Sequence, residues 1–164
     1  MKKTERPVEP PLRESRAILD SLRRIVRGLR LYARHCETHL GLSAAQLFAL
    51  RKVQEGGPLS LQELAEATLT DLSSVSVVAE RLRAKGLLKR RQAETDRRRA
   101  ELTVAPAGLA VLHRSPDPLQ DRLVASLLSL PHARRRALER DLAKLVHDAG
   151  LDSRTAPLFF EEEP

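Results

Sequence analysis

Residues 71–108 read DLSSVSVVAERLRAKGLLKRRQAETDRRRAELTVAPAG. The first part has apolar residues at helical spacing behind Asp71, a residue type that favours the N-cap of a helix. Two short runs follow, Leu87–Gln92 and Arg99–Val104, and they flank a basic turn, which predicts a β-hairpin. A helix followed directly by such a hairpin is the arrangement of a winged helix, with Ala93–Arg98 as the turn of the wing.

Positive charge is concentrated in the same part of the chain. Residues 81–99 hold nine Lys/Arg and two Asp/Glu, a surplus of +7, and the whole chain of 164 residues is also +7, so the other 145 residues sum to zero. A clustered basic segment is typical of a nucleic-acid-binding protein. Because the cluster lies on a predicted hairpin, and not on an amphipathic helix with a bulky apolar face, DNA is favoured over a membrane surface.

Two capping boxes precede this region. Ser43-Ala44-Ala45-Gln46 and Ser60-Leu61-Gln62-Glu63 each predict the start of a helix. The first helix is expected to end near Gly56, with its apolar residues inward, and the second is short. Two short capped helices joined by a tight turn are what a helix-turn-helix requires. The inward residues are expected to be Leu47, Leu50 and Val53 in the first helix and Val75, Val78 and Leu82 in the helix after Asp71.

Helical patterns also occupy the two ends of the chain. Apolar residues recur every three or four positions over 12–40, and Gly41 fits a C-terminal stop. This helix is longer than one small domain can bury along its apolar side, so we expect a second chain to bury the rest. Residues 106–150 read as helices interrupted around 115–118 and 129–131. We expect both ends to pack together and against a two-fold mate.

The residues quoted above carry a family resemblance. Asp71 to Gly86, the wing with Asp96-x-Arg98 and the later Gly108 closely resemble the MarR family of bacterial transcription regulators, over roughly residues 12–150. The resemblance implies a homodimer formed by the N- and C-terminal helices, with one DNA-reading head per subunit. It also implies that Arg98 enters the minor groove and that Asp96 stiffens the wing by pairing with a nearby arginine.

The expected fold class is mainly α (α+β), a winged helix-turn-helix with a two-stranded β-wing and N- and C-terminal dimerisation helices. The expected boundaries are an N-terminal arm at 1–11, a single domain at 12–150 with dimerisation helices at 12–40 and 106–150 and a DNA-binding head at 43–104, and a tail at 151–164.

DNA contacts are expected from the helix after Asp71 and from the hairpin. Serine hydroxyls can hydrogen-bond bases or phosphates, and Val77 can pack on a thymine methyl. Strand cations suit phosphates, while cations at the tip of a hairpin reach a narrow minor groove. The alternative for such a charge run is a solvated turn. The expected contact residues are Ser73, Ser74, Ser76, Val77, Arg81, Lys89, Arg91, Arg97, Arg98 and Arg99.

The predicted function is that of a homodimeric repressor that binds a pseudo-palindromic operator. A small-molecule effector that binds in the cleft between the dimer helices and the head is expected to relieve the repression. A thiol or zinc sensor on the same scaffold is an alternative, through Cys36 or the pair His35 and His39. A lone thiol on an apolar stripe is more often a core residue, however, and the histidines fit a solvated helix end. A helical interaction module that binds no DNA is a further alternative.

The sequence gives no support for an enzyme, a disulfide-bonded protein or a membrane protein. There is no glycine-rich phosphate loop, no His-Glu-x-x-His and no nucleophile elbow, so we expect neither an enzyme nor a bound cofactor or metal. The single cysteine excludes an intramolecular disulfide. No apolar run approaches the ~18–20 residues that span a bilayer, and no apolar core follows the basic N-terminus, so we expect a cytoplasmic protein. Phe159 and Phe160, beside three glutamates, favour docking of the tail on a groove.

Overall fold

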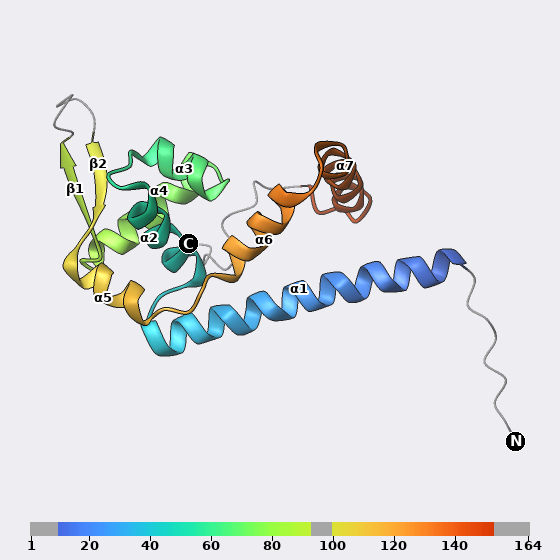
Figure 1. Ribbon diagram of the computed structural model, residues 1–164, viewed down its shortest axis with the longest axis horizontal. Coiled ribbons are helices and arrows are strands. Elements are labelled where there is room, and N and C mark those ends of the chain that lie inside the picture. Colours follow the sequence, from blue (N-terminus) through green and yellow to red (C-terminus); the bar gives the residue numbers. More distant parts are fainter. Residues whose placement is uncertain (1–9, 93–99, 153–164) are drawn as a thin grey trace, which may run out of the picture.

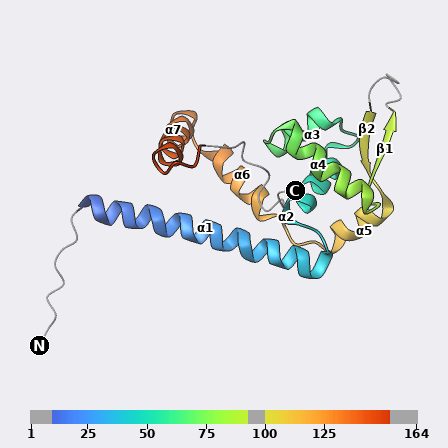
Figure 2. The same cartoon turned by 180° about the vertical axis from the view of Figure 1, so that it is seen from behind.

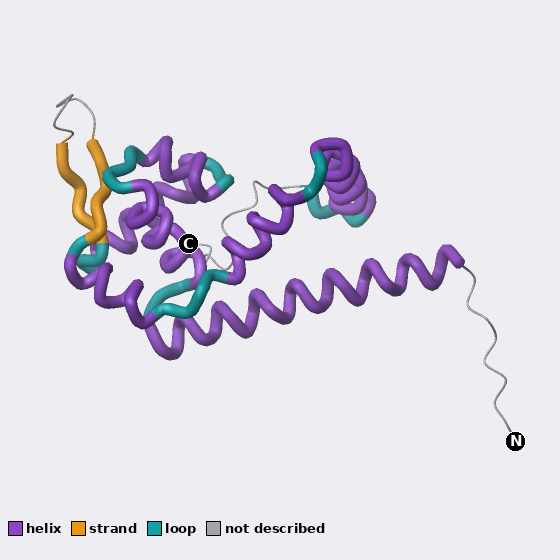
Figure 3. The backbone as a smooth tube through the Cα atoms, in the orientation of Figure 1, coloured by secondary structure: helices purple, strands orange, loops and turns teal. Residues whose placement is uncertain are grey.

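The computed structural model describes residues 10–92 and 100–152. A long helix, α1, runs away from a head that carries the hairpin (Figure 1). The elements in chain order are α1 (Pro10–Leu40), α2 (Ala44–Gly56), α3 (Leu61–Thr68), α4 (Leu72–Ala84), β1 (Leu88–Gln92), β2 (Ala100–Val104), α5 (Pro106–Arg114), α6 (Leu119–Ser129) and α7 (His132–Asp148). Figure 3 shows the predominance of helix over strand, as the sequence predicts.

Helix α1 begins at Pro10, two residues inside the arm expected at 1–11. Its predicted apolar stripe is present, but only the end next to the head is covered: Leu29, Ala33 and Cys36 are buried. Further towards the N-terminus the stripe faces solvent, and Ile18 is 54% exposed. The stripe is therefore half core and half uncovered surface.

Helices α2 and α3 begin where the capping boxes predict. Gln46 N donates to Ser43 Oγ at 3.1 Å, and Ser43 N donates to Gln46 Oε1 at 3.3 Å. In α3, Glu63 N donates to Ser60 Oγ at 3.2 Å and Ser60 N to Glu63 Oε2 at 2.8 Å. Each box satisfies backbone N–H groups that the first turn of a helix leaves without an intrahelical partner.

The turn from α3 to α4 is closed by Leu69 in the left-handed region, with φ of 54°. The N–H of Thr70 donates to the carbonyl of Ala65 at 3.1 Å, which ends α3. The chain then reaches Asp71 in an extended conformation, ready to cap α4. This tight turn produces the helix-turn-helix that the two capped segments predict.

Strands β1 and β2 form an antiparallel pair in which Leu88 lies opposite Val104 and Gln92 opposite Ala100. Strand β1 begins one residue later than the sequence predicts, while the expected start of the second strand, Arg99, lies outside the described residues. Leu59, in the turn between α2 and α3, bridges to Leu102: its N–H donates to the Leu102 carbonyl at 3.1 Å and its carbonyl accepts from Leu102 N at 2.7 Å. The wing is thereby fixed to the helix-turn-helix by backbone hydrogen bonds.

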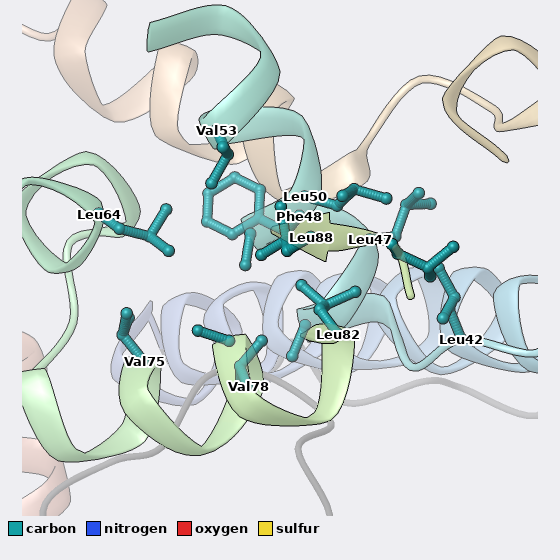
Figure 4. Close-up of a cluster of buried hydrophobic side chains, with 14 of the residues drawn as sticks. Leu42, Leu47, Phe48, Leu50, Val53, Leu64, Val75, Val78, Leu82 and Leu88 are labelled. Carbon is teal, nitrogen blue, oxygen red and sulfur yellow. The ribbon is translucent and has the colours of Figure 1, made fainter. Parts of the chain in front are cut away.

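The core of the head lies around α2 (Figure 4). Phe48 of α2 is 1% exposed and lies among apolar side chains of α3, α4 and β1. The predicted inward residues, Leu47, Leu50, Val53, Val75, Val78 and Leu82, are all buried. Burial of this set orients α4, because its apolar side faces the core and its opposite side must face solvent.

Helix α5 starts at Pro106, in the first turn where proline is tolerated. The interruptions before α6 and α7 fall at the prolines, Pro118 and Pro131, as predicted. Helix α6 approaches α1 closely, since a Cβ added to Gly28 would lie 3.2 Å from Leu119 Cδ2. Seen from behind, α6 and α7 lie towards the N-terminal end of α1 and away from the wing (Figure 2). Within the described ranges, every helix is too short or too polar to cross a bilayer.

Candidate nucleic-acid interface

Asp71 caps α4 through a small network. Its Oδ1 accepts from Ser74 N at 2.9 Å and from the Ser73 hydroxyl, and its Oδ2 accepts from Ser74 Oγ at 2.7 Å. The hydrogen bond from Ser73, followed by those from Ser74, holds the pKa of the Asp71 carboxyl well below its usual range. At neutral pH the ionised carboxylate of Asp71 therefore holds the first turn of α4 in place.

Replacing Asp71 with alanine is expected to lower the thermal midpoint at pH 7 and to matter much less at about pH 2. Because the folded pKa is depressed, the stabilisation is fully present above the unfolded pKa of about 4 and is lost as the pH falls towards the folded value. Thermal unfolding of both proteins between pH 2 and 7 measures the difference. Asp20→Ala on α1 is the control, and an equal midpoint gap at pH 2 and pH 7 would contradict the role of the charged carboxylate.

The exposed side of α4 carries the residues predicted to meet DNA. Ser73, Ser76 and Val77 are exposed, and Ser74 and Arg81 are partly exposed. They lie opposite the buried stripe on the same helix, so the predicted contact residues share a solvent-facing surface. The hydroxyl hydrogens of Ser73 and Ser74 are already donated to Asp71, which leaves their oxygens to accept hydrogen bonds.

Strand β1, next to α4, carries three cations, of which Arg90 lines a groove with Ser76 of α4. Lys89, Arg90 and Arg91 are exposed, while Leu88 is buried. Because side chains alternate along a strand, Lys89 and Arg91 project from one face of the hairpin and Arg90 from the other. The two predicted phosphate-binding residues of β1 are thus brought together on one face.

The tip of the wing, residues 93–99, lies outside the described part of the chain. The expected roles of Arg97, Arg98, Arg99 and Asp96 remain predictions.

A small groove separates α4 from the hairpin, with a volume of about 210 Å³. Ser76 lines it together with Arg90, a basic residue of the predicted hairpin, and Arg83, which the sequence does not single out. Arg83 Nη1 lies 2.5 Å from Glu80 Oε2 on the same helix. The position of Arg90, two residues after the buried Leu88, is the signal in the sequence that places it on the α4 side of β1.

The far end of α4 is tied to the long helix. Lys85 Nζ donates to the carbonyl of Gly41 at 2.9 Å. Gly41 has a φ of 65° and directly follows α1. The orientation of α4 is therefore linked to the end of α1 by a hydrogen bond between segments 44 residues apart in the chain.

Cys36 is fully buried, and burial raises the pKa of its thiol. A peroxide-sensing thiol needs the opposite, a lowered pKa and access to solvent. His35 and His39 are exposed and stacked, with ring centroids 4.2 Å apart. Over residues 10–92 and 100–152, these side chains belong to no group of three or more His, Cys, Asp or Glu suited to hold a metal ion.

A second hollow, of about 540 Å³, lies between α2 and α6. Arg51, Lys52 and Arg122 line it with acidic neighbours, and Lys52 Nζ lies 2.6 Å from Asp121 Oδ1. Partial burial opposes the charge on Lys52, but the hydrogen bonds from Lys52 to Asp121 and Glu55 outweigh it and raise its pKa. The buried Nε of Arg51 has no hydrogen-bond partner among the residues that the structure describes.

Comparison with known proteins agrees with this geometry. The sequence profile of the MarR family matches residues 40–99, from the end of α1 to the wing. The HTH-type transcriptional repressor MdtR of Bacillus subtilis is 35% identical over 68 residues, which are 42% of this chain and 44% of that repressor, so the match spans less than half of the relative.

Solved structures extend the likeness over most of the chain. BpsR of Bordetella bronchiseptica is 27% identical, with 79% of this chain and 98% of that chain covered and a TM-score of 0.53. A probable transcriptional regulator from Pseudomonas aeruginosa is 28% identical, with 78% and 96% covered and a TM-score of 0.53. MarR of E. coli, at 21% identity, covers 77% of this chain and 95% of its own with a TM-score of 0.54. The predicted fold class is confirmed.

Proposed function

Because the chain belongs to the MarR family of transcriptional regulators, we propose that it binds double-stranded DNA sequence-specifically as a homodimeric repressor in the cytoplasm, with no catalytic step. The observation that carries the proposal is that the exposed start of α4 and the exposed cations of the neighbouring strand β1 belong to one rigid head. Asp71 fixes the start of α4, and the Leu59–Leu102 bridge fixes β2, the strand paired with β1, to the helix-turn-helix. A capped helix with a free polar side, flanked by basic strands, fits the major groove and its phosphates.

In the proposed complex, α4 of each subunit enters a major groove and the two half-sites lie about one helical turn apart. Ser76 and Val77 face the base edges, while Lys89 and Arg91 contact phosphates. The wing arginines, Arg97 to Arg99, reach the flanking minor groove. Occupation of the operator by the dimer excludes other proteins from the same DNA, and this exclusion represses transcription.

Selection of bound sequences from random double-stranded DNA, at near-physiological salt, tests the proposal. Enrichment of a pseudo-palindrome with half-sites about ten base pairs apart supports a dimeric reader of a specific operator. Uniform binding that weakens with salt and enriches no sequence would contradict it, because charge alone produces that behaviour. A double substitution, Ser76→Ala with Val77→Ala, should change the enriched sequence more than the total binding.

The homodimer is proposed on the uncovered part of α1. Ile18, Leu22 and Ile25 are exposed at helical spacing, and α7 exposes Leu142 and Leu145. Exposed apolar patches of this kind, on a surface that is otherwise polar, mark protein–protein interaction sites.

Replacing Ile18 with glutamate is expected to weaken self-association by about 10²-fold or more, because a carboxylate would be buried without a partner. Light scattering across a dilution series measures the change in mass. Ala17→Glu, on the neighbouring exposed position away from the apolar stripe, is the matched control and should remain a dimer. Equal masses for both variants would contradict a dimer contact along this stripe.

The hollow between α2 and α6 is the proposed effector site. Glu55 and Asp121 pair with Lys52, while Arg51 and Arg122 form no ion pair with the described residues and suit the carboxylate of a small ligand. The ligand relieves repression only if it binds one arrangement of the heads more tightly than the other. A panel of aromatic carboxylates can be screened for release of the selected DNA, including 6-hydroxynicotinic acid, which regulates DNA binding of BpsR. Release that is equally strong in Arg51→Gln would exclude this site.

A further inference from the structure

The groove of about 210 Å³ between α4 and the hairpin carries polar side chains from both sides. Ser76, Glu80 and Arg83 line it from α4, at spacings of four and three residues that place them on one side of the helix. Arg90 lines it from β1, and apolar residues of α3, α4 and β2 complete the lining. Ser76, Glu80 and Arg90 are exposed, so these polar groups are open to solvent.

The charges in this groove leave a surplus of one positive charge. Glu80 and Arg83 form an ion pair on α4, in which Arg83 Nη1 lies 2.5 Å from Glu80 Oε2. Over residues 10–92 and 100–152, Arg90 forms no ion pair. Two arginines against one glutamate give the groove a net charge of +1, which is opposite and equal to that of a single phosphodiester. A guanidinium is also a donor group that suits phosphate oxygens.

The position of the groove in the proposed DNA complex identifies the anion. In that complex α4 lies in a major groove and the wing reaches the adjacent minor groove. One sugar–phosphate backbone separates a major groove from the minor groove beside it, so this backbone has to cross the protein between α4 and the hairpin. Helix α4 packs directly against β1, and the groove with Arg90 lies between them.

We propose that this groove binds one phosphate of the DNA strand that crosses it, through the guanidinium of Arg90. The inference rests on the proposed DNA binding and names the contact that seats α4 and the wing on the same DNA strand. Ser76 lines the groove and also belongs to the base-facing side of α4, so a phosphate held here fixes the position of α4 relative to the bases. Glu80 pairs with Arg83 and so limits the attraction to DNA of any sequence.

The alternation of side chains along β1 assigns its cations to different DNA strands. Arg90 faces α4, while Lys89 and Arg91 project from the opposite face of the hairpin. A hairpin that reaches a minor groove has one DNA strand on each of its faces. Arg90 is therefore expected to contact the DNA strand that crosses between the hairpin and α4, and Arg91 the complementary strand.

Neutral linkages in the operator test the proposal. Single methylphosphonates are placed along both strands of the selected operator, and the Kd of each DNA is measured for the parent protein and for Arg90→Gln. One methylphosphonate, between the bases read by α4 and the flanking minor groove, is expected to weaken binding of the parent about 10-fold. Arg90→Gln should lose a similar factor on unmodified DNA. The two changes together should cost no more than either alone, because each removes the same contact.

Arg91→Gln is the matched control on the opposite face of the hairpin. Its loss should add to that of the methylphosphonate coupled to Arg90, and should be coupled instead to a methylphosphonate on the complementary strand. Additive losses for Arg90→Gln at every phosphate, or coupling of both variants to the same phosphate, would overturn the assignment while leaving the proposed function intact. Failure of the parent protein to select any operator would overturn the proposed function, and the inference with it.

Inorganic phosphate separates the two sources of the anion. Titrated into the free protein at constant ionic strength, it is expected to shift the thermal midpoint no more than chloride does. Stabilisation by phosphate that Arg90→Gln abolishes, together with additive losses on every modified DNA, would assign the groove to a free anion and overturn the DNA contact.

Glu80→Gln tests the role of the ion pair. Loss of the carboxylate releases Arg83 and adds one positive charge, so the slope of log K against log salt should steepen by about 0.9 and binding to random DNA should tighten. Glu66→Gln removes an exposed carboxylate of α3 that does not line the groove, and it should leave the slope unchanged. An equal change in both variants would show that total charge, rather than the pair with Arg83, sets the affinity for random DNA.

Discussion

Replacing Gly108 with alanine is expected to destabilise the head by about 3 kcal/mol or more, at the upper end of the effects of overpacking. A Cβ at this position would lie 2.4 Å from the carbonyl oxygen of Leu87 and 2.8 Å from Val104 Cγ1. The Leu87 carbonyl already accepts a hydrogen bond from Ala105 N at 2.9 Å, so it is held in place. The gain in helix propensity, about 1 kcal/mol, does not offset displacement of the backbone where α5 meets the wing.

Chemical denaturation monitored by circular dichroism measures this effect. Gly28→Ala is the matched control, since Gly28 also lies in a helix but its added Cβ would meet only the end of the Leu119 side chain, at 3.2 Å. That variant should stay within about 1 kcal/mol of the parent, because a side-chain end can shift. Equal stability of both variants would mean that the junction of α5 and the wing is looser than the structure shows.

Replacing Lys89 and Arg91 together with glutamine is expected to weaken DNA binding roughly 10- to 100-fold at 0.15 M salt. Each cation that leaves a phosphate removes about 0.9 from the slope of log K against log salt, so the slope should fall by about 2. The fold should survive, because both side chains are exposed on β1. Fluorescence anisotropy with the selected operator, repeated from 50 to 300 mM salt, as is usual for such slopes, measures both quantities.

The paired control removes the same charge elsewhere. Arg16→Gln with Arg24→Gln changes two exposed arginines on α1, far from the wing. This variant should keep the slope of the parent protein. A slope that changes equally in both variants would show that net charge, rather than the position of β1, governs binding.

Local signals in the sequence were sufficient to predict most of the head. The serine–glutamine and serine–glutamate boxes and Asp71 act over three residues, so their hydrogen bonds appear in the structure as predicted. Helix α2 is different, because it packs against α1, α3, α4, α5 and β2. Its residues 44–50 are all buried, so no polar side marks its orientation, and Phe48 was not predicted to be central.

Features that depend on tertiary contacts escaped sequence-based prediction. The groove with Arg83 and Arg90 exists because Leu59 holds β2 against the helix-turn-helix, and no short-range pattern encodes that bridge. The hollow near Arg51 likewise joins α2 to α6, about 70 residues later. The expected roles of Asp96 and Arg97 to Arg99 stay predictions, since they fall outside the described residues.

The length of α1 has a mechanical consequence. Its 31 residues make a rod of about 46 Å at 1.5 Å per residue, and Lys85 ties the end of that rod to α4. With the far half clamped in a dimer, the free half is an arm of about 23 Å, and a bend of about 10° where the clamped half ends displaces the head by roughly 4 Å. Two heads tilting in opposite senses would change their separation by about twice that amount, enough to disturb register with a pitch of about 34 Å in DNA. The free half of α1 therefore acts as a lever that turns a modest bend at the edge of the dimer contact into a change in operator fit.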